Sequence, residues 1–403
     1  MLLLLPLIGS VFLSRFSFNF HERKLALPLL IIAASVAGLA LFGKLRIHLP
    51  RAILFTLTMA AMVTSTVLGG AGRVSVMSFL LLAVIYLGYI FVVECSAATY
   101  AWIIGAFRAI CLVTACAGIA QFFAQLVIPG PTLFTFRGYI PDQFLALEYH
   151  YVDPIDLWAG ANKSNGFFLP EPSIFSQLMG LAAVVELLFF RPSWRLAVIG
   201  FALFVAFSGT GVLLCLVFLP VLLLRRGDPS LLLLAICALL LLLLFINSPY
   251  LEPFVGRLGE FDSTRSSAFA RFLSPFYLFD DFLLPNLRNA LFGMGPGAID
   301  VFFNNYYIDV HDPTWGKVFF EYGLVGTLPF AVFVLCSFFG DAPEKWLSSA
   351  LFFNWLLLGG YLLSAPVAGL VLALAVWHRA PRPPAAPPPD PRLMFRYRPE
   401  DPS

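Results

Sequence analysis

Long apolar blocks separated by short polar stretches recur along the chain. The blocks are near 20 residues long, which is the length an α-helix needs to cross the hydrocarbon core of a bilayer. Candidate spans lie at 2–18, 25–43, 51–70, 75–94, 101–128, 167–190, 195–208, 210–224, 230–247, 318–340, 346–359 and 361–378. The pattern therefore predicts an all-α polytopic membrane protein with about 12 transmembrane helices.

Two of these assignments depend on local sequence chemistry. The segment 208–211, Ser-Gly-Thr-Gly, interrupts an apolar run, and these residue types favour a tight turn. The first apolar stretch, residues 1–13, lacks a basic start and a small-residue cleavage site. We therefore interpret it as a short first span and not as a signal peptide.

The distribution of basic residues predicts the orientation, because positively charged short loops stay in the cytoplasm. Lys and Arg occur in the connections at 44–51, 191–195 and 225–226 and in the segment after residue 378. All four agree with both termini lying inside. One connection disagrees, since Arg15, Arg23 and Lys24 would then lie outside.

This topology divides the chain into six segments. They are N-terminal helices (1–129), a first large loop (130–166), central helices (167–247), a second large loop (248–317), C-terminal helices (318–379) and a Pro-rich tail (380–403). Both loops would be extracytoplasmic, and the tail would be disordered in the cytoplasm. We expect the protein to reside in an inner membrane.

Composition supports this class and excludes others. Hydrophobic residues make up 60% of the chain and charged residues only 12%, about half of what an ordinary soluble domain needs to cover its surface. The net charge of +2 gives no reason to expect a nucleic-acid partner. None of the six cysteines lies in a large loop, so neither a disulfide framework nor a zinc site is indicated.

A first candidate site spans residues 163–173, Lys-Ser-Asn-Gly-Phe-Phe-Leu-Pro-Glu-Pro-Ser. Pro172 and Ser173 suit the start of a helix, where Glu171 would act as a cap. Alternatively, Glu171 is a proton acceptor held at the membrane surface. Lys163 is a candidate phosphate ligand, as is Arg137 in the same loop.

A second candidate site lies in residues 256–272, which contain Arg257, Arg265 and Arg271. Arginine suits bidentate recognition of phosphate. Anchoring to lipid headgroups, or ion pairing with a nearby acidic residue, is the alternative for each of them.

A third candidate site comprises the glycine-rich run 289–297, then His311, then Glu321. The run lacks the Lys-Ser/Thr ending of a phosphate loop, although its glycines permit a close approach to a ligand. His311 could transfer a proton or be structural. Glu321 lies just inside an apolar span, where an ionisable group is a candidate for function.

The order of these blocks resembles that of the bacterial O-antigen polymerase and O-antigen ligase superfamily. The resemblance rests on Lys163–Ser173, on Arg271 followed by Gly293–Gly297, and on His311 followed by the segment 321–326, Glu-Tyr-Gly-Leu-Val-Gly. It covers roughly residues 100–340. It implies a membrane glycosyltransferase of GT-C type that uses polyprenyl-diphosphate-linked sugars.

The resemblance also implies roles for individual residues. Arg271 matches the arginine that holds the diphosphate, and His311 matches the histidine that ends the second loop. Lys163 stands where the family usually has arginine, which removes bidentate geometry there. The Glu-Pro-Ser ending of the first block is closer to the polymerases than to the ligases.

The implied reaction transfers glycan from undecaprenyl diphosphate to another lipid-linked repeat unit. Arg271, with one of Arg257, Arg265 or Lys163, would stabilise the leaving diphosphate, and His311 or Glu171 would be the base. We expect no metal or other cofactor; a chain-length regulator and a flippase are possible partners.

Two alternatives remain open. One is a ligase that transfers glycan to lipid A core or to protein. The other is a flippase or transporter for lipid-linked oligosaccharides. A transporter should carry charges within its spans, but these hold few, and we interpret Arg108, Glu94 and Glu186 as snorkelling towards the cytoplasmic surface.

Overall fold

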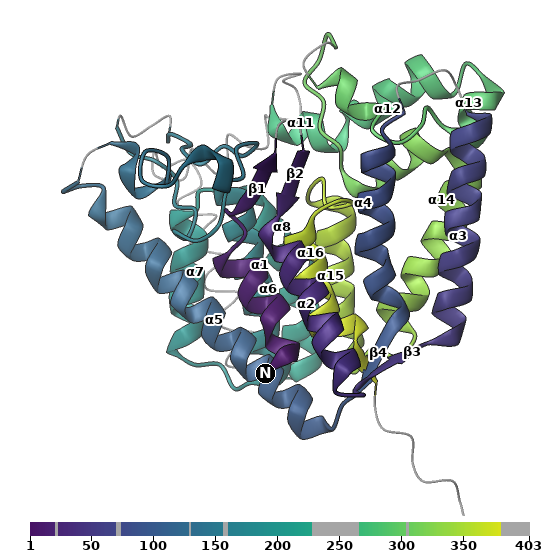
Figure 1. Cartoon of the computed structure of the whole chain (residues 1–403). Coiled ribbons are helices and arrows are strands. Elements are labelled where there is room, and N and C mark those ends of the chain that lie inside the picture. The colour runs from purple at the N-terminus through teal and green to yellow at the C-terminus, as the bar shows by residue number, and fades with distance from the viewer. Residues whose placement is uncertain are drawn as a thin grey trace, which may run out of the picture.

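The protein is a bundle of apolar helices. A computed structural model describes residues 1–20, 23–69, 74–128, 130–155, 160–227, 266–303 and 306–379 (Figure 1). In this part of the chain five helices are long and apolar enough to cross a membrane. They are α3 (Leu49–Leu68), α5 (Ala97–Ala124), α6 (Pro172–Phe189), α8 (Gly209–Arg226) and α14 (Thr314–Phe339). The helical content is as predicted, and these apolar helices are compatible with a polytopic membrane protein.

Shorter helices occupy the other predicted spans. They are α1 (Leu5–Phe12), α2 (Leu27–Leu41), α4 (Val76–Leu87), α7 (Trp194–Val205), α15 (Lys345–Leu357) and α16 (Ala365–Val371, continued as a π-helix over Leu372–Val376). The turn predicted at 208–211 does separate α7 from α8. The predicted span 230–247 lies outside the described residues.

Two helices end earlier than predicted, because strands form at the C-terminal ends of the predicted spans. The helix predicted over 2–18 ends at Phe12, and the one predicted over 75–94 ends at Ile90. The strands are β1 (Ser17–Phe20), β2 (Arg23–Ala26), β3 (Leu45–Ile47), β4 (Phe91–Glu94) and β5 (His378–Arg379). β1 pairs with β2, and β4 lies between antiparallel β3 and parallel β5. Aromatic and β-branched residues such as those of β4 fit a pleated strand.

The bundle has two different ends. The N-terminus and the sheet β3–β4–β5 lie at one end, and the described parts of both large loops lie at the other (Figure 1). The second loop contains α11 (Ser267–Phe272), α12 (Ser274–Leu278), α13 (Leu287–Phe292) and short turns at Phe279–Leu283 and Ile299–Phe302. It encloses a hydrophobic core of its own, which includes Phe269, Leu278, Leu283, Ile299 and Phe320. This loop is therefore a folded cap over the helix ends.

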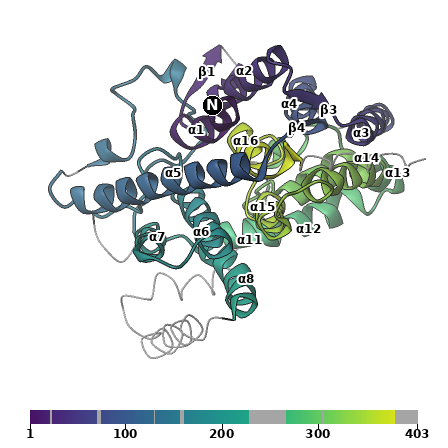
Figure 2. The same cartoon turned by 90° about the horizontal axis from the view of Figure 1, so that it is seen from below.

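Helix α6 lies at the centre of the part of the bundle beside the first loop (Figure 2). It is the most enclosed of the five long helices, and it packs closely against α8. A Cβ atom on Gly211 would lie 2.0 Å from the carbonyl oxygen of Ser176, and one on Gly180 would lie 2.9 Å from the oxygen of Gly211. Small residues thus let the two backbones touch, as is common for helices in membranes.

The basic connection that disagreed with the charge rule has a structural explanation. Arg15 is fully buried. Its guanidinium donates to the carbonyl oxygen of Leu169 at 2.9 and 2.6 Å and to that of Phe134 at 2.9 Å. Lys24 forms an ion pair with Glu148 at 3.2 Å. Arg15 therefore joins α1 to the first large loop through buried contacts, and Lys24 joins the first hairpin to the same loop through a surface ion pair.

Arg108 and Glu186, two of the charged residues within the predicted spans, pair with each other, and the interpretation of snorkelling was wrong for Glu186, which is buried. Arg108 binds Glu186 through two hydrogen bonds of 2.6 and 2.8 Å, and Glu186 is 1% exposed. Glu94 lies in strand β4 and not in a helix, and its half-exposed side chain forms an ion pair with Arg46 at 2.6 Å. A buried carboxylate such as that of Glu186 requires a cationic partner such as Arg108.

Candidate functional site

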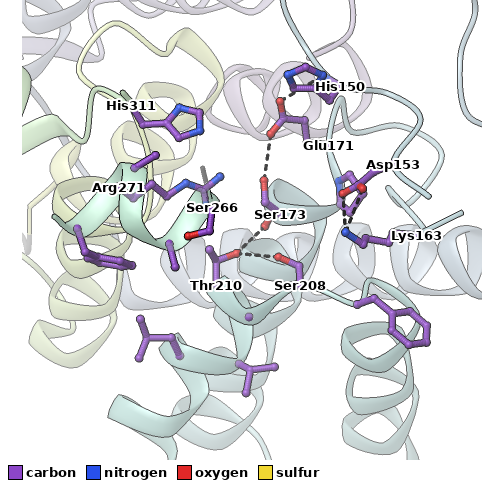
Figure 3. Close-up of a pocket in the computed structure, with 18 of the residues that line it drawn as sticks. His150, Asp153, Lys163, Glu171, Ser173, Ser208, Thr210, Ser266, Arg271 and His311 are labelled. Atoms are coloured by element: carbon purple, nitrogen blue, oxygen red, sulfur yellow. Dashed lines mark hydrogen bonds and ion pairs between the residues drawn. The ribbon is translucent and has the colours of Figure 1, made fainter. Parts of the chain in front are cut away.

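A cavity of about 700 Å³ lies where the first loop, the beginnings of α6 and α8, and helix α11 of the second loop meet (Figure 3). Its polar lining consists of His150, Asp153, Lys163, Glu171, Ser173, Ser208, Thr210, Ser266, Arg271, Asp309 and His311. Segments far apart in sequence therefore combine into one site. Four of the predicted site residues, Lys163, Glu171, Arg271 and His311, are among them.

Glu171 lies in the middle of this lining. It occupies the N-cap position of α6, directly before Pro172, but its side chain accepts no N–H group from the helix. One carboxylate oxygen accepts the backbone N–H of His150 at 3.3 Å, and the other accepts the hydroxyl of Ser173 at 3.1 Å. The carboxylate is thus oriented into the cavity by two donors.

Arg271 and His311 lie together on one side of Glu171 (Figure 3). Arg271 is in the last turn of α11, and the N–H of His311 donates to the carbonyl oxygen of the neighbouring Ala270 at 3.3 Å. In the described part of the chain Arg271 has neither a hydrogen-bond partner nor an ion-pair partner. Its guanidinium is therefore available to an anion in the cavity.

The same surroundings set the charge state of His311. Its ring is exposed to the cavity, yet desolvation by the surrounding protein, followed by the charge of Arg271, lowers its pKa below 6.5. The carboxylates of Asp312, Glu171 and Asp309 act in the opposite direction. The imidazole is accordingly neutral at neutral pH, and a neutral ring both donates and accepts a hydrogen bond.

Lys163 lies on the other side of Glu171 (Figure 3). Its ammonium group is 3.0 Å from each carboxylate oxygen of Asp153. Lys163 therefore reaches the cavity as half of an ion pair and not as a free cation.

Helix α8 provides the apolar wall of the cavity. Val212, Leu213 and Leu216 face it, and the Leu216 side chain is 65% exposed. At the top of this wall, the hydroxyl of Thr210 donates to the carbonyl oxygen of Ser173 at 3.2 Å and lies 3.2 Å from the hydroxyl of Ser208. The cavity thus borders polar groups on one side and a lipid-like surface on the other.

The glycine-rich run 289–297 packs its backbone directly against the backbone of α14. α14 is kinked at Gly323, which has φ +58°, a conformation that favours glycine. The kink leaves the carbonyl oxygens of Phe320 and Glu321 free to accept the N–H groups of Met294 and Gly295, both at 2.9 Å. A Cβ atom on Gly323 would lie 2.5 Å from the N atom of Gly293. The two glycine motifs are therefore complementary halves of one close contact.

Glu321 belongs to a buried charge cluster below the second loop. Lys317 is at its centre, 2.9 Å from Asp300, 2.9 Å from Asp312 and 3.7 Å from Glu321. The Lys317 side chain is 5% exposed and that of Glu321 is 1% exposed. Since Asp312 follows His311 directly in sequence, this cluster anchors the backbone that carries the histidine.

The remaining predicted site residues lie elsewhere. Glu321 is in the buried cluster and does not line the cavity. Arg137 is exposed on the first loop, where its side chain donates to the carbonyl oxygen of Leu147 at 3.4 Å. Arg257 and Arg265 lie outside the described residues.

Several lining residues were not singled out from the sequence. Ser208 and Thr210 are in the turn that was predicted on other grounds, so the polar turn residues were a usable signal. His150, Asp153 and Asp309 lie in loops with no recognisable motif. Only the folding of the loops brings them to the cavity.

The fold and the site together define a class: a helical membrane protein with a partly polar, partly apolar cavity at one end of its bundle. The model of the WcaD colanic acid polymerase family matches residues 4–293. The chain belongs to this family, which confirms the predicted resemblance to bacterial polysaccharide polymerases and makes it a membrane polymerase of polysaccharide repeat units.

The matched residues include Lys163, Glu171 and Arg271, whereas His311 and Glu321 lie beyond them. No curated protein and no solved structure matches the chain.

Proposed function

We propose that the protein lengthens a polysaccharide by transferring glycan from a polyprenyl diphosphate carrier to a lipid-linked repeat unit at the outer face of the inner membrane. The observation that carries this proposal is one cavity with an oriented carboxylate, an apolar wall and an arginine that has no partner among the described residues. A lipid-linked sugar diphosphate has three complementary parts. Its anion matches the arginine, its sugar hydroxyls match the carboxylate, and its hydrocarbon chain matches the apolar wall.

Each group has a role that follows from its place. The acceptor hydroxyl loses its proton to Glu171 as its oxygen bonds to the anomeric carbon of the donor. The bond between that carbon and the diphosphate oxygen breaks, and the electron pair leaves with polyprenyl diphosphate. Arg271 stabilises the charge that develops on this leaving group, and His311 donates a hydrogen bond to it.

The relative positions favour Glu171 over His311 as the base. In a direct displacement the nucleophile and the leaving group lie on opposite sides of the reacting carbon. His311 lies beside Arg271, on the leaving-group side, whereas Glu171 lies across the cavity (Figure 3). We therefore expect inversion of configuration at the anomeric carbon. Because Arg271 would stabilise the leaving diphosphate, we also expect no requirement for a metal.

The test is polymerisation by purified protein in detergent with a synthetic polyprenyl-diphosphate repeat unit, with and without chelator. We expect a ladder of products that survives chelator, disappears with Arg271→Ala and falls at least about 100-fold with Glu171→Gln. Arg137→Ala is the matched control, because this arginine is exposed on a loop away from the cavity. An unchanged ladder from Arg271→Ala would refute the proposal, and single transfer to lipid A core without a ladder would indicate a ligase.

A further inference from the structure

The ion pair between Lys163 and Asp153 is held by a rigid frame. The N–H of Lys163 donates to the carbonyl oxygen of Asp153 at 2.8 Å, and Pro154 and Asn162 form an antiparallel bridge next to it. The backbone N–H and carbonyl oxygen of Asn162 both bind the side chain of Gln125, the C-cap residue of α5, at 2.7 and 3.1 Å. These backbone contacts hold Lys163 and Asp153 opposite each other, so the ammonium group would have to give up its ion pair to turn towards another ligand.

The Lys163–Asp153 pair and Arg271 differ in the charge that they present to a diphosphate. The charges of Lys163 and Asp153 cancel at short distance, so a diphosphate gains little from approaching them. If Lys163 turned to phosphate, it would leave Asp153 unpaired beside a second anion, which is costly in a partly enclosed cavity. The diphosphate should therefore bind at Arg271.

The pair is well suited to a different ligand. An ammonium group has three N–H donors and a carboxylate has about four lone-pair positions. The mutual contact uses only part of each set, and the remaining groups form strong, charge-assisted hydrogen bonds. Adjacent hydroxyls of a sugar both donate and accept, so one sugar can bind the carboxylate and the ammonium group together.

We propose that the Lys163–Asp153 pair is the subsite for the acceptor sugar, the residue of the lipid-linked unit whose hydroxyl is glycosylated. The pair lies on the side of Glu171 away from Arg271 (Figure 3). A sugar bound there presents its hydroxyl to the Glu171 carboxylate, while the donor diphosphate occupies the Arg271 side. This assignment rests on the proposed function and adds the place and chemistry of acceptor recognition.

The test separates the two substrates chemically. A donor-only unit has its acceptor hydroxyl capped. An acceptor-only unit has a methylene group in place of the anomeric oxygen, so its phosphonate cannot leave. Transfer between them is measured with purified protein while each concentration is varied. Lys163→Met and Asp153→Asn should each raise the KM for the acceptor about tenfold, equivalent to about 1.4 kcal/mol. The KM for the donor should change less than twofold.

The opposite result has a clear meaning. If Lys163→Met raises the KM for the donor and Asp153→Asn lowers it, Lys163 is a phosphate ligand and the subsite assignment is wrong. The exchanged pair, Asp153→Lys with Lys163→Asp, tests for simple bracing of the loop. It should restore thermal stability but not the KM for the acceptor, and recovery of both would overturn the assignment.

Failure of the assignment is distinguishable from failure of the proposed function. If the wild-type protein transfers no glycan from the donor-only to the acceptor-only unit, the reaction itself is wrong. If it transfers glycan and both single variants keep the wild-type KM for the acceptor, only the subsite is wrong. Arg137→Ala serves as the control with both KM values unchanged.

Discussion

Replacing Lys317 by methionine tests whether the buried charge cluster stabilises the fold. The substitution keeps an unbranched apolar chain but removes the only cation that lies near three carboxylates in the described part of the structure. Asp300 and Asp312 are 48% and 22% exposed, so water can partly replace Lys317 there. Glu321, at 1% exposure, has no such access.

The expected magnitude follows from these exposures. Removing one partner of a buried ion pair lowers the free energy of unfolding by about 3–5 kcal/mol. Because Asp300 and Asp312 are partly exposed to water, we expect a loss of about 3 kcal/mol for Lys317→Met. Glu321→Gln should cost less, since Lys317 keeps both aspartates. In the double variant the buried carboxyl at position 321, which has lost its cationic partner, is replaced by an amide, so about 1–2 kcal/mol of the loss should be recovered.

The measurement is the free energy of unfolding in mixed detergent micelles titrated with a denaturing detergent. Lys345→Met is the matched control, because this lysine is exposed at the start of α15, and its change should stay within about 0.5 kcal/mol. A Lys317→Met protein as stable as the wild type, or a double variant less stable than the single one, would show that the cluster does not stabilise the fold in this way.

Four further predictions use the same titration. Arg15→Met should cost about 1–3 kcal/mol for each carbonyl group it orphans and make the first loop sensitive to protease; a protected loop would contradict the clamp. Gly323→Ala should cost at least about 2 kcal/mol through strain and backbone overlap, so wild-type stability would exclude the close contact. Arg108→Met should cost about 3–5 kcal/mol, and adding Glu186→Gln should recover part of it; additive losses would argue against pairing. Because the native pKa of His311 is lowered below 6.5, the unfolded chain binds the proton more readily, so stability should fall as pH drops from 6.5 through the native pKa. His311→Gln should flatten that slope, and an unchanged slope would assign it to another group.

The positions of most helices could be predicted because the signal is local. A run of apolar residues of bilayer length is stable as a helix whatever it packs against, since every backbone group is satisfied within the segment. The turn at 208–211 could also be predicted, because its signal, the Ser, Gly and Thr residues themselves, is equally local. The ends at Phe12 and Ile90 were missed because strands follow both helices: β1 pairs with the adjacent β2 in a local hairpin, and β4 pairs with the distant β3.

The site shows where local reasoning stops. The sequence alone indicated Lys163, Glu171, Arg271 and His311 as candidates for one chemistry, through residue type and order, and the cavity does bring them together. It could not indicate that Lys163 is paired with Asp153 ten residues earlier.

Partners across long separations were equally hidden from the sequence. Arg15 holds Leu169 across 154 residues, and the glycine run 293–297 is a dock for α14 and not a phosphate loop. Residue type determines which interactions a side chain can form. Only packing between distant segments determines which partner it meets, and therefore whether a charge remains free for substrate.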